Sequence, residues 1–191
     1  SYSKLKENIN NFKNSFKSFS PLICFAVKSN TNLNIIKEIK KLGLGADVVS
    51  QGELMMALKA GINPNKIVFS GVGKTSNEIS FAIEKKILLI NAESLSEVKE
   101  INRIAKFKNR KVNIGVRLNP DTDAKTLIQI STGKKENKFG VNKSILYEII
   151  NYCNNSNNIN LKCLSVHIGS QILDYKPYEK MLKTVSQILS K

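Results

Sequence analysis

The sequence predicts an α/β protein of the (β/α)8 TIM-type barrel class, with about six strand–helix units present in the chain. Short apolar segments alternate with amphipathic segments along the whole length, a succession typical of a parallel sheet covered by helices. Polar side chains also follow the ends of the apolar segments, where a parallel barrel carries its active site. The alternative architecture for the same succession is an open, doubly wound sheet.

Hydrophobic periodicity predicts each element in turn. Residues 4–19 carry apolar side chains at helical spacing, and Pro21 ends this helix before a buried strand at 22–27. Residues 32–43 carry the next helical stripe, closed by Gly43. Further strands are predicted at 46–50, 66–71, 87–93, 111–120 and 161–169, and further helices at 51–61, 75–86, 94–107, 144–153 and 177–191.

Three of the predicted helices begin with the same capping signal, a hydroxyl residue followed three positions later by glutamate. In a capping box the hydroxyl and the carboxylate reciprocally satisfy free backbone N–H groups. The three pairs are Ser50 and Glu53, Thr75 and Glu78, and Ser94 and Glu97.

The length bounds the domain organisation. A complete barrel typically needs about 250 residues, whereas this chain has 191. Residues 1–191 are therefore expected to form a partial barrel domain, with the rest of the barrel outside the chain. The polar stretch at 121–140 is long for a connection, and loops of this length are usually functional.

The net charge of +15 raises the question of nucleic acid, but the distribution of basic residues argues against it. Arginine occurs only at Arg103, Arg110 and Arg117, and phosphate and groove recognition favour its bidentate fork. The lysines are spread over every segment. We expect a solvated lysine surface and no nucleic-acid partner.

Composition also indicates the compartment. No apolar run approaches the roughly 20 residues of a membrane helix, and the first residues are charged and periodic, unlike a signal peptide. The three cysteines, Cys24, Cys153 and Cys163, are odd in number and widely spaced, which favours neither a disulfide framework nor a metal site. We expect a cytoplasmic protein without a metal.

GVGKT at 71–75 resembles the end of a phosphate-binding loop, but the full motif requires a glycine at position 68, where Val68 stands. We interpret the segment as a glycine turn before the helix that Thr75 caps. The chain also contains no GxGxxG fingerprint, so a Rossmann cofactor site has no support.

Polar side chains gather at the predicted strand ends, which a parallel barrel brings to one face. They are Lys28, Asp47, Ser50, Ser70, Asn91, Glu93, Arg117, Asn119, His167 and Ser170. A lysine that emerges from an apolar strand into such a rim is suited to act as an amine nucleophile. Its chemistry would be a Schiff base, with a carbonyl substrate as in an aldolase or with pyridoxal phosphate. The alternative is a structural ion pair with Asp47.

Seven segments resemble the diaminopimelate decarboxylases, pyridoxal-phosphate enzymes of the alanine-racemase-like barrel type. The resemblance covers nearly the whole chain in order, and FSGVGKT, KENKFG and HIGSQ are its more specific motifs. The segments are AVKSN (26–30), GADVVSQGEL (45–54), ALKAG (57–61), KIVFSGVGKT (66–75), VRLNPDTDAKT (116–126), ISTGKKENKFG (130–140) and HIGSQ (167–171).

The resemblance implies roles for individual residues. Lys28 and His167 would be catalytic: Lys28 would form the internal aldimine with pyridoxal 5'-phosphate, and His167 would stack on the pyridine ring. Ser170 would contact the phosphate or the histidine. Asp47 would lie near the lysine, and Arg117 would lie at the edge of the ring. Lys138 matches a position near the site, with no role assigned.

The resemblance further implies decarboxylation of meso-diaminopimelate at its D-configured centre, giving L-lysine in lysine biosynthesis. A related decarboxylase of ornithine or arginine, a racemase or aldolase, and a non-catalytic pyridoxal-phosphate-binding fragment remain alternatives.

The family also has a C-terminal β-rich domain and forms homodimers that share their sites, and these parts lie outside the chain. The chain alone is therefore expected to be inactive. It departs from the family at Leu127, where the family often has histidine.

Overall fold

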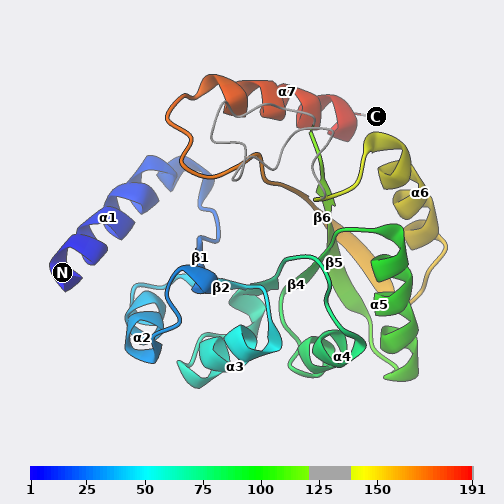
Figure 1. The fold of residues 1–191 in the computed structure, drawn as a ribbon, viewed down its shortest axis with the longest axis horizontal. Helices are drawn as coiled ribbons and strands as arrows, with labels where there is room; N and C mark the ends of the chain where they lie inside the picture. The colour runs from blue at the N-terminus through cyan, green and yellow to red at the C-terminus, as the bar shows by residue number, and fades with distance from the viewer. Residues whose placement is uncertain (121–138, 191) are drawn as a thin grey trace. The chain divides into compact units, whose positions relative to one another are not determined.

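The computed structural model describes residues 1–120 and 139–190 (Figure 1). The chain divides into two compact units, Ser1–Ile90 and Asn91–Lys191, with the boundary inside strand β4. Six strands take the sheet order β1-β2-β3-β4-β5-β6, the order in which they occur in the sequence. The predicted succession of strands and helices is confirmed.

The first unit is built on parallel pairing. Phe25 pairs with Ala46, Ala46 with Ile67, and Phe69 with Ile90. Its elements are α1 (Tyr2–Ser15), η1 (Lys17–Phe19), β1 (Cys24–Ala26), η2 (Val27–Ser29), α2 (Leu33–Lys41), β2 (Gly45–Val48), α3 (Gln51–Lys59), η3 (Pro64–Lys66), β3 (Ile67–Phe69), α4 (Ser76–Glu84) and β4 (Leu89–Ala92).

The core of the first unit lies between the short strands and the helices that follow them. Figure 1 shows α2, α3 and α4 along the outer side of the strands. Ile36 and Ile39 on α2 and Leu54 on α3 are buried with Phe69 of β3, as the helical stripes predict. Burial of such side chains contributes most of the favourable free energy of folding.

The second unit continues the same pattern. β5 and β6 are parallel, with Val112 opposite Ile159 and a register shift between Ile114 and Gly115. The core of this unit includes Ile101, Val116 and Ile149. Its further elements are α5 (Leu95–Phe107), β5 (Val112–Leu118), α6 (Lys143–Asn154), β6 (Ile159–Val166) and α7 (Lys176–Leu189).

The first predicted helix forms, but none of its residues is buried. α1 ends at Ser15 rather than at residue 19, and a short 3-10 turn follows. Phe12 and Phe16 are exposed and pack on each other, with ring centroids 4.9 Å apart. The apolar face that the sequence predicts is therefore covered only in part, because Leu5 and Ile9 are half-buried while Phe12 and Phe16 are exposed.

The predicted capping boxes are only partly confirmed. Thr75 and Glu78 form a complete box, with both reciprocal hydrogen bonds present. Ser50 and Ser94 cap their helices as expected. Their glutamates instead accept from the residue before the cap: Val49 N–H donates to Glu53 and Glu93 N–H donates to Glu97. These N–H groups stand at the end of a strand, where sheet pairing no longer satisfies them.

The segment GVGKT forms the glycine turn that we expected. Gly71 and Gly73 have φ angles of 94° and 74°, in the left-handed region that favours glycine. Lys74 Nζ donates to the Gly71 carbonyl oxygen, and Thr75 caps α4. The turn leads from β3 into α4.

Gly45 has no room for a side chain, and this predicts a sharp stability effect. A Cβ at Gly45 would lie 2.1 Å from the Lys66 carbonyl oxygen, a backbone atom next to β3. We expect Gly45→Ala to lower the free energy of unfolding of the full-length protein by about 1–3 kcal/mol, measured by urea denaturation.

The matched control is Gly52→Ala in the first turn of α3. A Cβ there would meet only Ser50 Oγ, at 3.8 Å. Because alanine favours the helix over glycine, we expect this substitution to raise stability by about 0.5–1 kcal/mol. Equal stability of the two variants would contradict the close approach at Gly45.

Candidate active site

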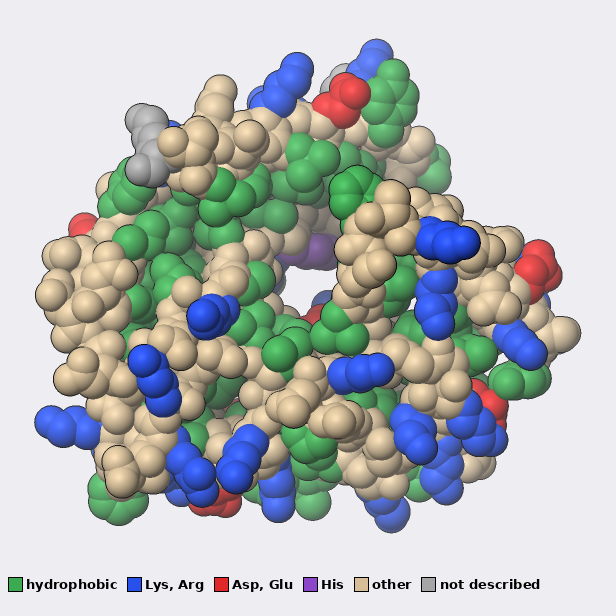
Figure 2. Space-filling view, turned by 180° about the vertical axis from the view of Figure 1, so that it is seen from behind, with side chains coloured by type: hydrophobic (Ala, Val, Ile, Leu, Met, Phe, Trp, Pro, Cys, Tyr) green, Lys and Arg blue, Asp and Glu red, His purple; other side chains and the backbone are tan. Residues whose placement is uncertain are grey.

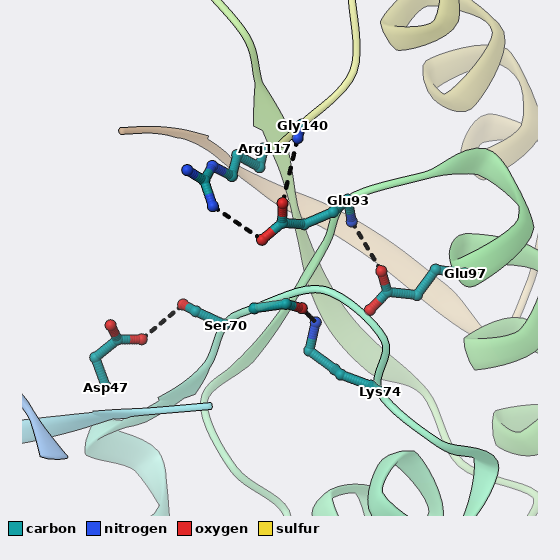
Figure 3. Close-up of polar contacts among 8 residues, drawn as sticks. Asp47, Ser70, Lys74, Glu93, Glu97, Arg117 and Gly140 are labelled. Atoms are coloured by element: carbon teal, nitrogen blue, oxygen red, sulfur yellow. Dashed lines mark hydrogen bonds and ion pairs between the residues drawn. The ribbon is translucent and has the colours of Figure 1, made fainter. Parts of the chain in front are cut away.

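Two strand-end side chains of the first unit contact each other directly. Ser70 Oγ donates a 2.6 Å hydrogen bond to Asp47 Oδ1 (Figure 3). The contact arises because β2 and β3 are parallel neighbours, with Asp47 opposite Val68 and Ser70 two residues further on. Both side chains are half-buried. The hydroxyl therefore restrains the Asp47 carboxylate.

Lys28 lies in the 3-10 turn η2 that follows β1, and β1 ends at Ala26, one residue before the end of the predicted strand 22–27. Ser29 Oγ donates to the Ala26 carbonyl oxygen at 2.7 Å, and Asn30 N–H donates to that of Val27 at 3.0 Å. Val27 is completely buried and anchors the turn. The Lys28 side chain is exposed.

The structural ion pair considered for Lys28 is not present. Among the residues that the structure describes, Lys28 forms no ion pair with Asp47. Asp47 instead accepts from Ser70. The lysine thus stands on a fixed turn without a carboxylate partner from the described part of the chain.

Cys24 lies two residues before Ala26 on β1, and its environment makes it a poor nucleophile. Burial, and secondly the negative charge of Asp47, raise the pKa of the Cys24 thiol to about 11. Burial also raises the pKa values of Cys153 and Cys163. The thiols therefore stay protonated near neutral pH, and all three cysteines are free.

In the second unit, Arg117 is paired with a carboxylate that follows β4. Arg117 Nη1 donates to Glu93 Oε1 at 3.1 Å, and the two side chains are 14% and 4% exposed. The second oxygen, Oε2, accepts from the Gly140 N–H at 3.2 Å. Figure 3 shows Glu93 between Arg117 and Gly140. The guanidinium also lies 5.0 Å from the ring centre of Phe139, within the range of a cation–π interaction.

The chain rejoins β5 at Phe139–Val141. Val141 N–H donates to the Arg117 carbonyl oxygen at 2.8 Å, and Asn119 N–H donates to that of Val141 at 2.9 Å. Gly140 has a φ of 76°, and a Cβ there would lie 2.8 Å from the Arg117 carbonyl oxygen. The glycine is therefore required by this pairing. Lys138 and Leu127 lie outside the described residues.

His167 and Ser170 follow the sixth strand. β6 ends at Val166, so His167 comes directly after the strand rather than within it. Both side chains are exposed, and the imidazole, the only one in the sequence, is visible in purple in Figure 2. The same view shows Lys and Arg side chains spread over the surface, in agreement with a solvated lysine surface.

Glu93 was recognised from the sequence as a strand-end acid but was not expected to be a site residue. The structure shows it bound to Arg117, which was expected to be one. The signal available in the sequence was an acidic residue directly before the capping Ser94, at the end of an apolar strand. Sequence spacing alone does not reveal which cation such an acid meets.

Glu78 connects two of the loops that follow the strands. Its Oε2 accepts from Thr75 N–H and its Oε1 from Gln51 N–H, both at 3.0 Å. The backbone hydrogen bonds from Thr75, and secondly from Gln51, lower the pKa of the Glu78 carboxyl. The start of α3 is thereby tied to the start of α4.

Two further findings limit the kinds of site that the described residues form. None of the helices in residues 1–120 and 139–190 is long and apolar enough to cross a membrane. The same residues contain no group of three or more His, Cys, Asp or Glu side chains that could hold a metal ion.

Parallel strands with lysine, carboxylates, arginine and histidine at or just after their carboxyl ends are typical of a barrel that carries its active site there. A sequence profile described as pyridoxal-dependent decarboxylase, pyridoxal binding domain, matches residues 2–191. The chain therefore belongs to this family of pyridoxal-binding domains.

Individual relatives agree with this assignment and with the resemblance seen in the motifs. The diaminopimelate decarboxylase of Helicobacter pylori strain J99 is 46% identical over 187 residues, which cover 98% of this chain and 46% of the relative. The diaminopimelate decarboxylase of Aquifex aeolicus is 41% identical over 181 residues, which cover 95% of this chain and 43% of that relative. The chain thus spans about half the length of the curated relatives that it matches.

Solved structures support the partial barrel and not the alternative of an open, doubly wound sheet. The crystal structure of diaminopimelate decarboxylase from Helicobacter pylori complexed with L-lysine superposes with a TM-score of 0.97 at 44% identity, covering 100% of this chain and 48% of that one. The diaminopimelate decarboxylase from M. jannaschii in co-complex with L-lysine gives a TM-score of 0.89 at 36% identity, with 100% and 46% covered.

The role of Glu78 predicts a pH-dependent stability. Because its pKa is lowered in the folded protein, its stabilisation is present above its ordinary pKa of about 4.3 and is lost as the pH falls through the folded value. We expect Glu78→Gln to lower the free energy of unfolding by about 1 kcal/mol at pH 7, and the difference from wild type to shrink below pH 4.

Denaturant unfolding of the full-length protein between pH 3 and pH 7 measures this difference. Glu148→Gln is the control, since Glu148 is exposed on α6 and makes no hydrogen bond or ion pair with the described residues. A Glu78→Gln deficit that stayed constant with pH would show that the carboxylate charge has no part in the cap.

Proposed function

We propose that the full-length protein containing this chain decarboxylates meso-diaminopimelate to L-lysine with pyridoxal 5'-phosphate as its cofactor. The observation that carries the proposal is the match of a pyridoxal-binding family to residues 2–191, in a chain whose first strand leads to Lys28 on a fixed turn. The diaminopimelate decarboxylases among its relatives support meso-diaminopimelate as the substrate.

The side chains of the chain fit this cofactor chemically. Lys28 offers a primary amine to the cofactor aldehyde, without a carboxylate partner from the described residues. Ser170 offers a hydroxyl to the phosphate, and His167 offers a flat ring to the pyridine. Arg117 offers a cation to the edge of the ring, and Asp47 a carboxylate near the lysine. We propose that these five residues serve one cofactor.

The chemistry divides between cofactor and protein. When bound, pyridoxal phosphate supplies an electron sink for the pair that remains at the substrate α-carbon as carbon dioxide leaves. The Lys28 amine would hold the cofactor, and Nζ would hold the proton that returns to the α-carbon. Ser70 keeps the Asp47 carboxylate in one orientation through the 2.6 Å hydrogen bond.

The main alternative is a decarboxylase for another basic amino acid, ornithine or arginine. The solved structures bound to L-lysine are diaminopimelate decarboxylases, so the proposal favours meso-diaminopimelate. Assaying carbon dioxide release from meso-diaminopimelate, ornithine and arginine separates the candidates. Preferred turnover of ornithine or arginine would overturn the assignment of substrate.

The proposal includes the setting of the enzyme. Residues 1–191 would form part of a barrel domain, completed by further units and a C-terminal β-rich domain elsewhere in the protein. The full-length protein would be a cytoplasmic homodimer acting in lysine biosynthesis. Sedimentation of the purified full-length protein tests the dimer.

Substitution of the proposed cofactor lysine gives a direct test. We expect Lys28→Ala to reduce turnover by roughly three orders of magnitude or more and to remove the visible absorbance of the lysine-bound cofactor. The reason is that no other residue among the five carries a primary amine. Lysine formation and absorption spectra measure the two effects.

Lys37→Ala is the control for this test, because Lys37 is an exposed lysine of α2. We expect it to stay within about twofold of wild type. Survival of the cofactor absorbance in Lys28→Ala would show that another residue attaches the cofactor.

The chain by itself should lack activity. We expect residues 1–191 alone, supplied with pyridoxal phosphate, to form no measurable lysine, whereas the full-length protein turns over. The expected cause is that the family completes its cofactor and substrate sites with residues outside this segment. Robust turnover by the isolated chain would contradict the proposal that the site needs them.

A further inference from the structure

We propose that Glu93 is a positioning residue for the cofactor site, holding the Arg117 guanidinium and the Phe139–Gly140 turn in one arrangement. The inference rests on the proposed function, because Arg117 is among the residues proposed to hold pyridoxal phosphate. Glu93 acts through Arg117 and is not proposed to touch the cofactor.

The two carboxylate oxygens of Glu93 hold different parts of the chain. Oε1 accepts from Arg117 Nη1 at 3.1 Å, and Oε2 accepts from Gly140 N–H at 3.2 Å. The side chain is only 4% exposed. A carboxylate this deeply buried requires donors for its oxygens, and here the donors come from β5 and from the turn that rejoins it.

The backbone of Glu93 is itself fixed. Its N–H donates to Glu97 Oε2 at 2.9 Å, and Glu97 N–H donates to Ser94 Oγ at 3.1 Å. Hydrogen bonds at Glu93 and at the following Ser94 therefore fix the backbone between β4 and α5. The carboxylate therefore projects from a rigid point, which is what a positioning residue needs.

The contacts of Arg117 explain what Glu93 would determine. Among the described residues, Nη1 is the guanidinium nitrogen that has a hydrogen-bond partner, while Phe139 lies 5.0 Å away on the face of the group. The carboxylate fixes the position of the guanidinium and the ring restricts its tilt. The donors on Nε and Nη2 then point in a set direction for a ligand.

The chain offers a matched control in a second Glu–Arg pair. Arg103 bonds to both oxygens of Glu100 at 2.7 Å on α5, but these side chains are 65% and 30% exposed. A pair that is largely open to solvent and lies within one helix is screened and contributes little. Glu100→Gln therefore removes a carboxylate charge without disturbing the proposed site.

The test uses the full-length protein as wild type, Glu93→Gln, Glu100→Gln, Arg117→Lys and the double variant Glu93→Gln/Arg117→Lys. Titration of the apoenzyme with pyridoxal phosphate measures cofactor affinity. Hydrogen exchange of the apoenzyme measures protection of the Gly140 amide. We expect Glu93→Gln to weaken cofactor binding roughly tenfold and to speed Gly140 exchange, with Glu100→Gln within about twofold of wild type.

The double variant separates positioning from a general structural role. If Glu93 acts through Arg117, Glu93→Gln should weaken cofactor binding much less once Arg117 is lysine, so the two effects are not additive. Full additivity, or wild-type affinity and exchange in Glu93→Gln, would overturn the inference. If Glu93→Gln does not fold, Glu93→Asp replaces it: the charge remains, but the side chain is too short to bridge both donors, so the same losses are expected.

Failure of the proposed function would look different. A wild-type protein that binds no pyridoxal phosphate, or forms no lysine, overturns the proposed function itself. The exchange of the Gly140 amide in the apoenzyme still decides whether Glu93 holds the turn, because that measurement needs no cofactor.

Discussion

The strand ends of this protein depend on one recurring hydrogen bond, from a backbone N–H at the junction of strand and helix to a glutamate in the helix's first turn. The pairs are Val49 with Glu53, Thr75 with Glu78, and Glu93 with Glu97. Each bond satisfies an N–H that neither the sheet nor the helix uses. It also places a negative charge at a helix N-terminus, where the macrodipole favours it.

This bond fixes the backbone close to Asp47 and at Glu93. Val49 follows Asp47 by two residues, and Glu93 is itself the donor to Glu97. A strand that passes into a capped helix within a few residues leaves its last side chains little freedom. The capped helices thus hold the backbone here, and direct contacts such as Ser70 with Asp47 and Arg117 with Glu93 hold the side chains.

The sequence was sufficient to predict the succession of elements, because apolar periodicity and capping residues are local signals. The helix starts at Ser50, Thr75 and Ser94 were found in this way. Element ends were less accurate: β1 ends at Ala26 rather than at residue 27, where the Ser29 hydroxyl closes a turn, and a propensity argument does not contain such a bond.

The contact of Glu93 with Arg117 and Gly140 was beyond prediction for a different reason. It joins two neighbouring strands to a turn that follows residues 121–138, and only the folded chain decides which donors meet a buried acid. The sequence did mark each partner separately, as a strand-end acid, a strand-end cation and a glycine of the KFG motif. Local sequence patterns do not predict which residues of distant segments contact one another.

Lys28 is distinguished from the other lysines by its backbone position, not by burial or by the lack of an ion pair, since Lys37 also forms none with the described residues. It is as exposed as a surface lysine, but it stands between the buried Val27 and a hydroxyl-closed turn. A nearby carboxylate would stabilise the protonated ammonium form and disfavour attack by an amine lone pair. Asp47 is the strand-end acid opposite Ala26 in the register; it accepts a hydrogen bond from Ser70 and forms no ion pair with Lys28 among the described residues.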